Sequence, residues 1–326
     1  MTNSITLRSG LAGELDGLAY VRESLKLSAR ALFYRRQTRR WLSLLNSHPL
    51  FAQMLPSCPR LVNKIYRDYL TTNLACDERL DTLAAHYGFV IRTGLAPLVA
   101  QAAREPVELC RLQAKSDLGY RVVLRAGSVL VREGELILQL LHHDTLVSSV
   151  AFSFLRQQGG LTLGLGCLQG PPGNAGLELI RHATRELHGL RPKNLLLRLV
   201  RQLGFDLGCR DLILVGNANR VVAKSSRQGR VHADYNALWE ELHAVARADG
   251  DYVLACEDLP ELALEAIASK KRSEARKRHE MQAVAIGAIR AHIKAARRDA
   301  LALRLVYSAE AETAMAPREQ RQLHLA

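Results

Sequence analysis

The chain has 326 residues, a formal net charge of +13 and a sequence pI of about 9.8. Hydrophobic residues make up 48% and charged residues 24%, which is ordinary for a globular protein and excludes a disordered, low-complexity chain. The charge favours an acidic partner, such as nucleic acid, an anionic membrane face or a phosphate-bearing ligand. No apolar run reaches the ~18 residues of a membrane-spanning helix and no secretory signal is visible. We therefore expect a cytoplasmic protein, at most peripheral to the inner membrane.

The cysteine and histidine residues predict no metal site. Six cysteines at positions 58, 76, 110, 167, 209 and 256 lack the spacing of a disulfide framework or a zinc ribbon. Small buried thiols in a reducing compartment are the expected outcome. The run His142-His143-Asp144 is predicted to be a polar turn, because adjacent strand residues point to opposite faces.

Residues 1–105 are predicted to be mostly helical. Apolar residues recur at helical spacing from Leu25 to Leu45, alongside six Lys and Arg residues. This pattern fits a solvated basic face, and a second interpretation is an anion-binding surface. After prolines at positions 49, 56 and 59, further helices are predicted over 61–69, 76–88 and 97–104.

From Pro106 the hydrophobic period changes to two, which is typical of strands. Strands are predicted over 107–114, 120–125, 135–141, 146–155 and 161–168. The short links between them predict antiparallel pairs. Thr162, Gly164 and Gly166 share one face of the last strand, so a helix or a ligand can approach it closely.

The residues 161–217 form the centre of the predicted organisation. A strand is followed by helices over 175–187 and 194–207 and by a strand over 211–216. The loop between the two helices places His188, Arg191 and Lys193 where a helix begins. Beyond this unit we predict a short strand over 221–224, a basic loop over 225–231, a helix over 234–245 and a strand over 251–255.

One long helical pattern covers 259–298. Its apolar stripe between Met281 and Ile293 is expected to pack against the core. Residues 270–298 contain ten basic and two acidic residues, so this segment carries +8 of the net charge. The densest cluster is predicted to bind an anion and consists of Lys270, Lys271, Arg272, Arg276, Lys277 and Arg278.

These elements predict an α+β protein with a mainly antiparallel sheet flanked by helices, and a GNAT-like core is one option for it. We expect four parts: a helical N-terminal region over 1–105, an α+β core over 106–258, a long basic helix packed on the core over 259–308, and a disordered tail over 309–326.

Several stretches between residues 40 and 279 resemble the bacterial VirK/YbjX family. They are Arg40-Trp41-Leu42, Lys64, Tyr66-Arg67, Tyr69-Leu70, His86-Tyr87, Leu168-Gln-Gly-Pro171, Ala183-Thr-Arg-Glu-Leu-His-Gly-Leu-Arg-Pro-Lys193, Asp234-Tyr235, Leu238-Trp239-Glu240, Ser269-Lys-Lys-Arg272 and Arg276-Lys-Arg278. The resemblance implies a role in virulence, cell-envelope properties and resistance to cationic antimicrobial peptides. It implies no particular reaction.

The sequence departs from this family pattern at three positions. Gly216 precedes Asn217 where a Ser-Asn pair is expected, Arg220 stands near the place of a histidine, and Asn236 replaces the second aspartate of an Asp-Tyr-Asp run. These departures put in doubt any role that needs that histidine or that aspartate.

A first functional hypothesis is an acyl-CoA-dependent acyltransferase. An antiparallel sheet, a loop at a helix N-terminus and a strand ending in Asn are similar to the acyl-CoA-binding core of GNAT-type acetyltransferases. Free N–H groups and the helix dipole attract a pyrophosphate, and the loop adds two cations. The candidate cofactor-binding residues are His188, Gly189, Arg191, Lys193, Asn194 and Asn217, and the sequence assigns no catalytic residue.

Two features count against this hypothesis. The loop lacks the Gln/Arg-x-x-Gly-x-Gly/Ala spacing of that superfamily, and an extra helix precedes it. The simple alternative is a helix–turn–helix connection, in which Arg191 and Lys193 pair with local carboxylates such as Glu186.

A second hypothesis is a non-catalytic binder of an anionic partner. The basic helix would lie on phospholipid or lipopolysaccharide head groups, in preference to nucleic acid. Its alternative is a solvated helix whose apolar stripe packs on the core. The sequence leaves both hypotheses open.

Overall fold

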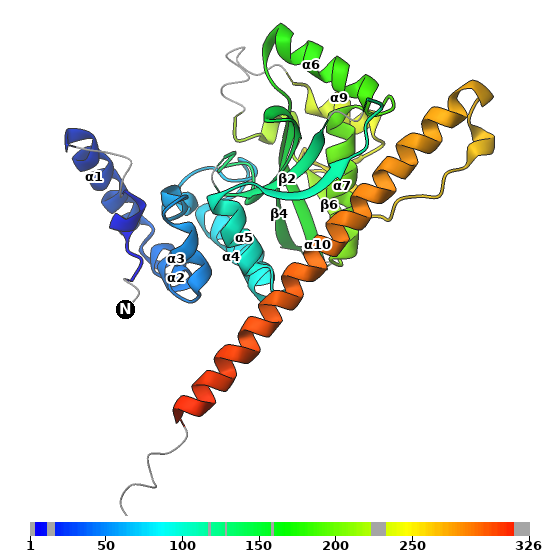
Figure 1. Ribbon diagram of the computed structural model, residues 1–326. Coiled ribbons are helices and arrows are strands. Elements are labelled where there is room, and N and C mark those ends of the chain that lie inside the picture. The colour runs from blue at the N-terminus through cyan, green and yellow to red at the C-terminus, as the bar shows by residue number, and fades with distance from the viewer. Residues whose placement is uncertain are drawn as a thin grey trace, which may run out of the picture.

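The structure is a computed structural model that describes residues 4–11, 17–116, 119–127, 129–157, 160–222 and 233–315, with side chains to residue 300. A twisted mixed sheet lies at its centre, and helices cover it (Figure 1). The α+β class predicted from the sequence is confirmed. The GNAT-like option for the core stays a hypothesis.

The sheet has eight strands and one parallel pair. In spatial order the strands are β1 (Val107–Leu112), β2 (Tyr120–Ala126), β3 (Leu136–His142), β4 (Thr145–Gln157), β5 (Gly160–Gln169), β6 (Asp211–Leu214), β8 (Tyr252–Ala255) and β7 (Val245–Ala246). Among the described strands, only β5 and β6 run parallel, over Leu163–Leu165 and Leu212–Leu214. The mainly antiparallel sheet and its strands other than β7 therefore match the prediction. The helix predicted over 234–245 is too long: it ends at Glu241, and Val245 then pairs with β8 as part of β7.

The helical elements fall into three groups. The N-terminal group is η1 (Leu7–Gly10), α1 (Gly17–Phe33), α2 (Arg35–Leu45), α3 (Pro49–Met54), η2 (Pro59–Leu61), η3 (Lys64–Tyr66), α4 (Cys76–Arg92) and α5 (Ala96–Arg104). The central group is α6 (Gly173–Glu186), α7 (Pro192–Asp206), η4 (Asn217–Asn219) and α9 (Tyr235–Glu241). The C-terminal group is η5 (Leu264–Ala266) and α10 (Ser269–Met315).

One continuous apolar core joins these groups. α4 packs on β4, α5 packs on β2, α7 covers β3 to β5, and α10 lies along β1 and α7 (Figure 1). The predicted stripe of α10 does face this core, since Met281, Ala285 and Ile289 are buried, although Val284 is exposed. None of the described helices is by itself long and apolar enough to cross a bilayer; α4 and α5 would satisfy the same criterion only together, and they are bent by 113°.

Three helical predictions in the N-terminal region are wrong in detail. The pattern from Leu25 to Leu45 forms two helices that break at Tyr34. The helix predicted over 61–69 is replaced by η2, η3 and an extended segment, because this stretch contributes buried polar contacts to the sheet. α4 continues through Gly88 to Arg92, since its apolar face still packs on the core beyond the glycine.

The C-terminal helix begins at Ser269 and not near Leu259. His279 Nε2 lies 3.0 Å from the Pro260 carbonyl oxygen, so the chain before the helix folds back along it. The helix extends to Met315, past the predicted start of a disordered tail, in keeping with its Ala-rich composition. Residues 316–326 lie outside the described chain. The predicted short strand over 221–224 is a turn at 221–222, and its remaining residues and the loop over 225–231 are also outside.

Candidate functional site

Asn217 follows β6 and holds the first turn of α9. Its side-chain nitrogen donates to Asp234 Oδ1 at 2.7 Å, and its side-chain oxygen accepts from the Tyr235 amide at 2.8 Å. Its own amide donates to Asn236 Oδ1 at 2.9 Å. The aspartate of the family pattern could accept the same hydrogen bond at this position, so Asn236 keeps the contact without the negative charge. The hydrogen bonds from Asn217 and from the Ala237 amide lower the pKa of Asp234, which caps α9.

Tyr235 fills the space between the carboxyl ends of the two parallel strands. Its hydroxyl accepts from the Leu168 amide at 2.7 Å and donates to the Leu168 carbonyl at 2.9 Å. The Arg220 guanidinium lies 3.9 Å from the centroid of its ring and donates to the Ala233 carbonyl. Burial raises the pKa of the phenol. Arg220 is itself buried, so the residue near the family's histidine position is an internal packing cation here.

The loop between α6 and α7 has the geometry of a helix–turn–helix connection. His188 and Gly189 adopt left-handed backbone angles, and the Gly189 amide donates to the Thr184 carbonyl, which closes α6. Pro192 starts α7, and Asn194 N donates to the Arg191 carbonyl. The pairing partner of Arg191 is Glu241, at 2.8 Å, and not Glu186 as the alternative interpretation suggested.

The structure does not bring Asn217 to this loop. Asn217 contacts the first turn of α9, whereas Arg191 contacts Glu241 at its last residue. The seven residues of α9 separate the two ends by about 10 Å. Lys193 stands at the start of α7, half-buried, and burial lowers its pKa. Whether the loop binds a cofactor stays a prediction.

The loop does lie beside the basic cluster of α10. A Cβ atom on Gly189 would stand 3.7 Å from the Glu274 carboxylate, and Lys115 pairs with that carboxylate at 2.8 Å. Burial lowers the pKa of His188, and the positive charges of Lys115 and Lys277 lower it further. The fold therefore joins two groups of residues that the sequence suggested for two separate sites.

The basic cluster itself occupies the first turns of α10. Ala275 is buried against the fold, and the side chains around it point to solvent. There is no acidic residue in the first turn of this helix. The exposed members are Lys270, Lys271, Arg272, Arg276 and Lys277, and Arg278 is half-buried.

A groove of about 680 Å³ lies farther along α10, against α7 and the turn between α4 and α5. Apolar side chains from two helices form its floor: Leu203, Leu207, Ile289 and Ile293. Five cations line it: Arg92, Arg290, Lys294, Arg297 and Arg298. The sequence pattern did not predict this groove, because it placed the stripe from Met281 to Ile293 against the core and assigned anion binding only to the cluster at 270–278.

The cations of the groove are not equivalent. Arg290 is held by Asp206, with both oxygens at 2.7 Å, and by Asp258 at 2.9 Å, and these bonds raise its pKa. Arg297 donates to the Thr93 carbonyl at 3.1 Å. Lys294 and Arg298 are exposed. Arg92 is exposed too, and these three cations have the greatest freedom to reach a ligand.

A second cleft, of about 600 Å³, lies over β5 and β6, and most of its lining is apolar or uncharged. The carboxylates that line it have structural partners. Glu78 accepts from the Ala75 amide, Asp249 pairs with Arg247, and Asp251 accepts from the Gly216 amide and from Asn219. These carboxylates hold loops and a helix start, so the cleft offers few acceptors to a ligand.

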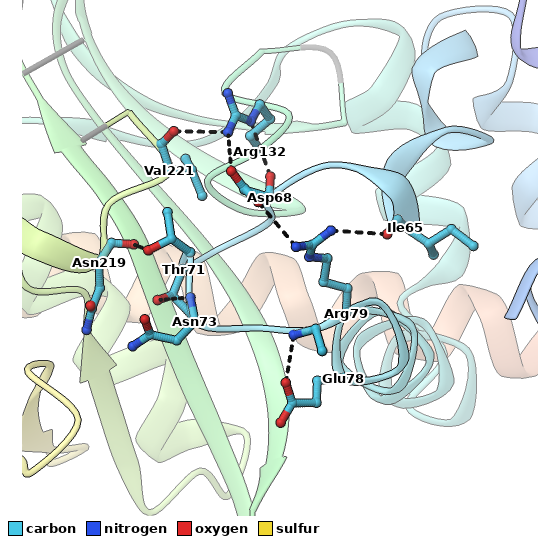
Figure 2. A network of polar contacts seen from close by, with 11 residues as sticks. Ile65, Asp68, Thr71, Asn73, Glu78, Arg79, Arg132, Asn219 and Val221 are labelled. Carbon is cyan, nitrogen blue, oxygen red and sulfur yellow. Dashed lines mark hydrogen bonds and ion pairs between the residues drawn. The ribbon is translucent and has the colours of Figure 1, made fainter. Parts of the chain in front are cut away.

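The segment 70–74 lines one side of this cleft, and a polar network holds the chain just before it in place. Figure 2 shows the Asp68 carboxylate between the guanidinium groups of Arg79, at 3.2 Å, and Arg132, at 3.5 Å. Arg132 also donates to the Val221 carbonyl at 2.9 Å. This network links α4, the turn before β3 and the chain after η4. Within the part of the chain that the structure describes, no group of three or more His, Cys, Asp or Glu residues could hold a metal ion.

Comparison with known proteins identifies a family. The family described as "Protein of unknown function (DUF535)" matches residues 16–290, most of the chain. The chain belongs to the DUF535 family. It is 28% identical over 261 residues to the "Uncharacterized protein YbjX" of Escherichia coli strain K12, covering 78% of this chain and 79% of that protein. It is also 25% identical over 269 residues to an "Uncharacterized protein" of Haemophilus influenzae, covering 81% and 88%. The resemblance drawn from the sequence is confirmed. No solved structure matches the chain.

Four of the positions that carry the DUF535 resemblance meet in a buried network. Lys64 pairs with Glu135, and both side chains are buried. Tyr87 donates to Glu135 Oε2 at 2.5 Å, and the ring of Tyr69 lies 5.2 Å from the Lys64 ammonium. Burial alone would raise the pKa of Glu135, but Lys64, the nearby His86 and the hydrogen bonds hold it below its usual value.

His86 completes this network from α4. Its ring is fully buried, stacks on Phe154 and accepts from the Phe154 amide at 3.1 Å through Nδ1. Desolvation, opposed by the charge of Glu135, lowers the pKa of His86 to about 4. Because the network joins η3, α4 and two strands, it anchors the N-terminal helices to the sheet of this DUF535 protein.

Replacement of Lys64 tests the anchor. Lys64→Met should lower the free energy of unfolding by about 3–5 kcal/mol, because Glu135 would be left as a buried charge without its cation. Urea denaturation followed by circular dichroism gives the value. The double variant Lys64→Met/Glu135→Leu should recover part of the loss, since it removes both charges.

Lys115→Met is the matched control, because Lys115 and Glu274 form an exposed pair. Its loss should be at most about 1 kcal/mol. Equal losses in Lys64→Met and Lys115→Met would contradict the role of the buried pair.

The same network predicts a loss of stability in mild acid. His86 binds a proton near pH 6.5 when unfolded and near pH 4 when folded, so the unfolded state binds more protons between these values. The free energy of unfolding should therefore fall by about 3 kcal/mol from pH 7 to pH 4 through this residue. Glu135, with its lowered pKa, adds a further loss at the acid end of this range.

His86→Gln should flatten the dependence between pH 6.5 and 5 while leaving the fall at lower pH. His243→Asn is the control, because His243 is exposed and lies outside the network, and this variant should keep the fall of the wild type. A wild-type profile that is flat from pH 7 to pH 5 would be inconsistent with a buried, neutral His86.

Proposed function

We propose that this DUF535 protein is a non-catalytic binder of an anionic, lipid-like partner at the bacterial cell envelope. The partner class is a phospholipid or lipopolysaccharide head group, in preference to nucleic acid. The setting is the one that the family resemblance implies: a cytoplasmic protein, peripheral to the inner membrane, that acts in envelope properties, virulence and resistance to cationic antimicrobial peptides.

The groove beside α10 is the observation that carries this proposal. Its floor is apolar and its rim is cationic, which is the complement of an amphiphile with a phosphate head and a hydrocarbon tail. A volume of about 680 Å³ is within the range of small-molecule sites. A nucleic acid would use the rim but not the floor, so the pairing of the two features favours a lipid.

The charge at the start of α10 supports the same partner. The positive end of the helix dipole lies here, so each cation in the first turn costs about 0.3–1 kcal/mol at an exposed site. An anionic surface placed against Lys270, Lys271 and Arg272 would remove that cost. The distance along the helix from residue 270 to residue 298 is about 42 Å, which an extended surface can cover and a small free anion cannot.

A short-chain lipid tests the groove. Dihexanoyl phosphatidylglycerol should bind below its micelle concentration, and dihexanoyl phosphatidylcholine should bind more weakly. Lys294→Gln/Arg298→Gln should weaken binding of the anionic lipid by about thirtyfold, since each cation contributes about 1 kcal/mol. Isothermal titration calorimetry measures both lipids.

Lys270→Gln/Lys271→Gln is the matched control, with the same loss of charge on the same helix but outside the groove. It should leave short-chain binding unchanged while weakening binding to lipopolysaccharide aggregates and flattening its salt dependence. Equal affinity for the two short-chain lipids would count against the groove. Tighter binding of duplex DNA than of either lipid would count against the partner class.

A second candidate function is GNAT-like, acyl-CoA-dependent acyl transfer. The parallel pair of β5 and β6 favours it, because ligands of open sheets bind beyond the carboxyl ends of parallel strands. The amide and the carbonyl of Leu168 stand at that position, and both are hydrogen-bonded to the Tyr235 hydroxyl in this structure. Acyl-CoA would have to displace this phenol or bind beside it, at the N-terminal end of α7.

Thermal unfolding tests this candidate. CoA or acetyl-CoA at ~100 times its dissociation constant should stabilise the protein by about 2.7 kcal/mol, which a melting curve resolves. Arg191→Ala should abolish the shift. Arg181→Ala is the control, because Arg181 makes an exposed pair with Glu178 on α6. A wild-type protein that shows no shift at millimolar ligand would remove this candidate.

A further inference from the structure

The outer face of α1 is an apolar surface that no described residue covers. Nine large apolar side chains are exposed among the described residues, and five of them belong to α1. They are Leu18, Val21, Leu25, Leu32 and Phe33, with exposed fractions from 52% to 88%. Scattered exposed apolar residues are normal in proteins, but a row along one helix marks an interaction surface.

The helical geometry places most of this row on one side. At 100° per residue, Leu18, Val21, Leu25 and Leu32 fall within a sector of about 60°. Leu27 points in the opposite direction and is buried against the rest of the protein. The side that attaches α1 to the fold is therefore not the side that carries the apolar row. A helix at the surface of a soluble domain normally turns polar residues outward, and α1 does the reverse.

Cations border this apolar row. Arg22, Lys26 and Arg30 follow one another along its flank and are exposed. Glu23 is the acidic neighbour, and its hydrogen bond with Lys26, at 2.8 Å, lowers its pKa. The start of α2 adds exposed cations with no acidic residue in its first turn: Arg35, Arg36 and Arg39.

We propose that α1 lies flat in the interface of an anionic phospholipid bilayer, with its apolar row among the acyl chains and its cations at the head groups. An apolar face bordered by Lys and Arg is the pattern of helices that bind in the plane of a membrane. Seventeen residues give a length of about 25 Å, which suits a helix that lies on the bilayer. α1 is at the periphery of the molecule, away from the sheet, so a flat surface can reach it (Figure 1).

The charges decide against a second copy of the chain as the occupant. Two α1–α2 faces packed together would bring the six cations of one copy against the six of the other, which opposes association. An anionic bilayer meets the same cations with opposite charge. The proposal extends the proposed function, since it shares the chemistry of the partner but uses none of the groove residues.

Vesicle binding by the full chain tests the proposal. The protein should co-sediment with vesicles of phosphatidylcholine and phosphatidylglycerol and bind phosphatidylcholine vesicles at least about tenfold more weakly. Leu25→Gln/Leu32→Gln should reduce binding to the anionic vesicles by at least about tenfold, since it removes two apolar side chains from the acyl region. Leu177→Gln/Val245→Gln is the control, because it removes two similarly exposed apolar side chains on α6 and β7, and it should bind as the wild type does.

A tryptophan on α1 gives an independent readout. Trp41 and Trp239 are fully buried, so in Leu25→Trp the change in emission on adding vesicles reports on α1. A blue shift with anionic vesicles only is the expected result. No shift, or equal binding by Leu25→Gln/Leu32→Gln and the control, would overturn the proposal. So would a wild-type dimer in sedimentation that Leu25→Gln/Leu32→Gln converts to a monomer, because the occupant would then be a second copy.

The groove variant separates this proposal from the proposed function. Lys294→Gln/Arg298→Gln should keep vesicle binding through α1 while losing short-chain lipid binding. Leu25→Gln/Leu32→Gln should show the converse. Loss of both activities in Leu25→Gln/Leu32→Gln, with an unchanged melting temperature, would overturn the assignment of a separate surface to α1.

Discussion

The parallel pairing of β5 and β6 is the constraint on which the second half of the fold depends. Antiparallel neighbours need only a short turn, but a parallel neighbour needs a crossover of a dozen or more residues. The chain fills this crossover with α6 and α7, so the loop at 187–191 must lie at the end where β5 finishes. α7 then covers β3 to β5, and its far end contributes Leu203 and Leu207 to the apolar floor of the groove beside α10.

The buried pair of Lys64 and Glu135 fixes the arrangement of the first half of the fold. It holds the N-terminal helices on the sheet, and through α4 it sets the position of Arg92 and the turn that follows. The groove is therefore a composite of three regions that are distant in sequence. A charge pair inside the core is a weak source of net stability, but it specifies one arrangement, because any displacement would leave a charge without its partner.

Local patterns were enough to predict the strands from 107 to 168, since alternation is a property of neighbouring residues. They failed over 61–69, because the side chains there bond to partners far away in sequence. Lys64 pairs with Glu135, just before β3, and the Tyr69 hydroxyl bonds to Ser153 on β4. The candidate loop was located correctly, but its distance from Asn217 depends on α9, which lies between them in space. The groove was missed because Arg92 and Leu203 approach α10 from segments roughly a hundred or more residues away.

The distribution of charge is difficult to explain by folding alone. Cations at the start of α10 oppose the helix dipole, and apolar side chains on α1 face outward with cations beside them. Each of these two features lowers the stability or the solubility of the isolated protein. Natural sequences break local rules of this kind mainly where a site requires it. Both violations would disappear against an anionic, partly apolar surface, so the lipid partner that we propose would account for features at opposite ends of the chain.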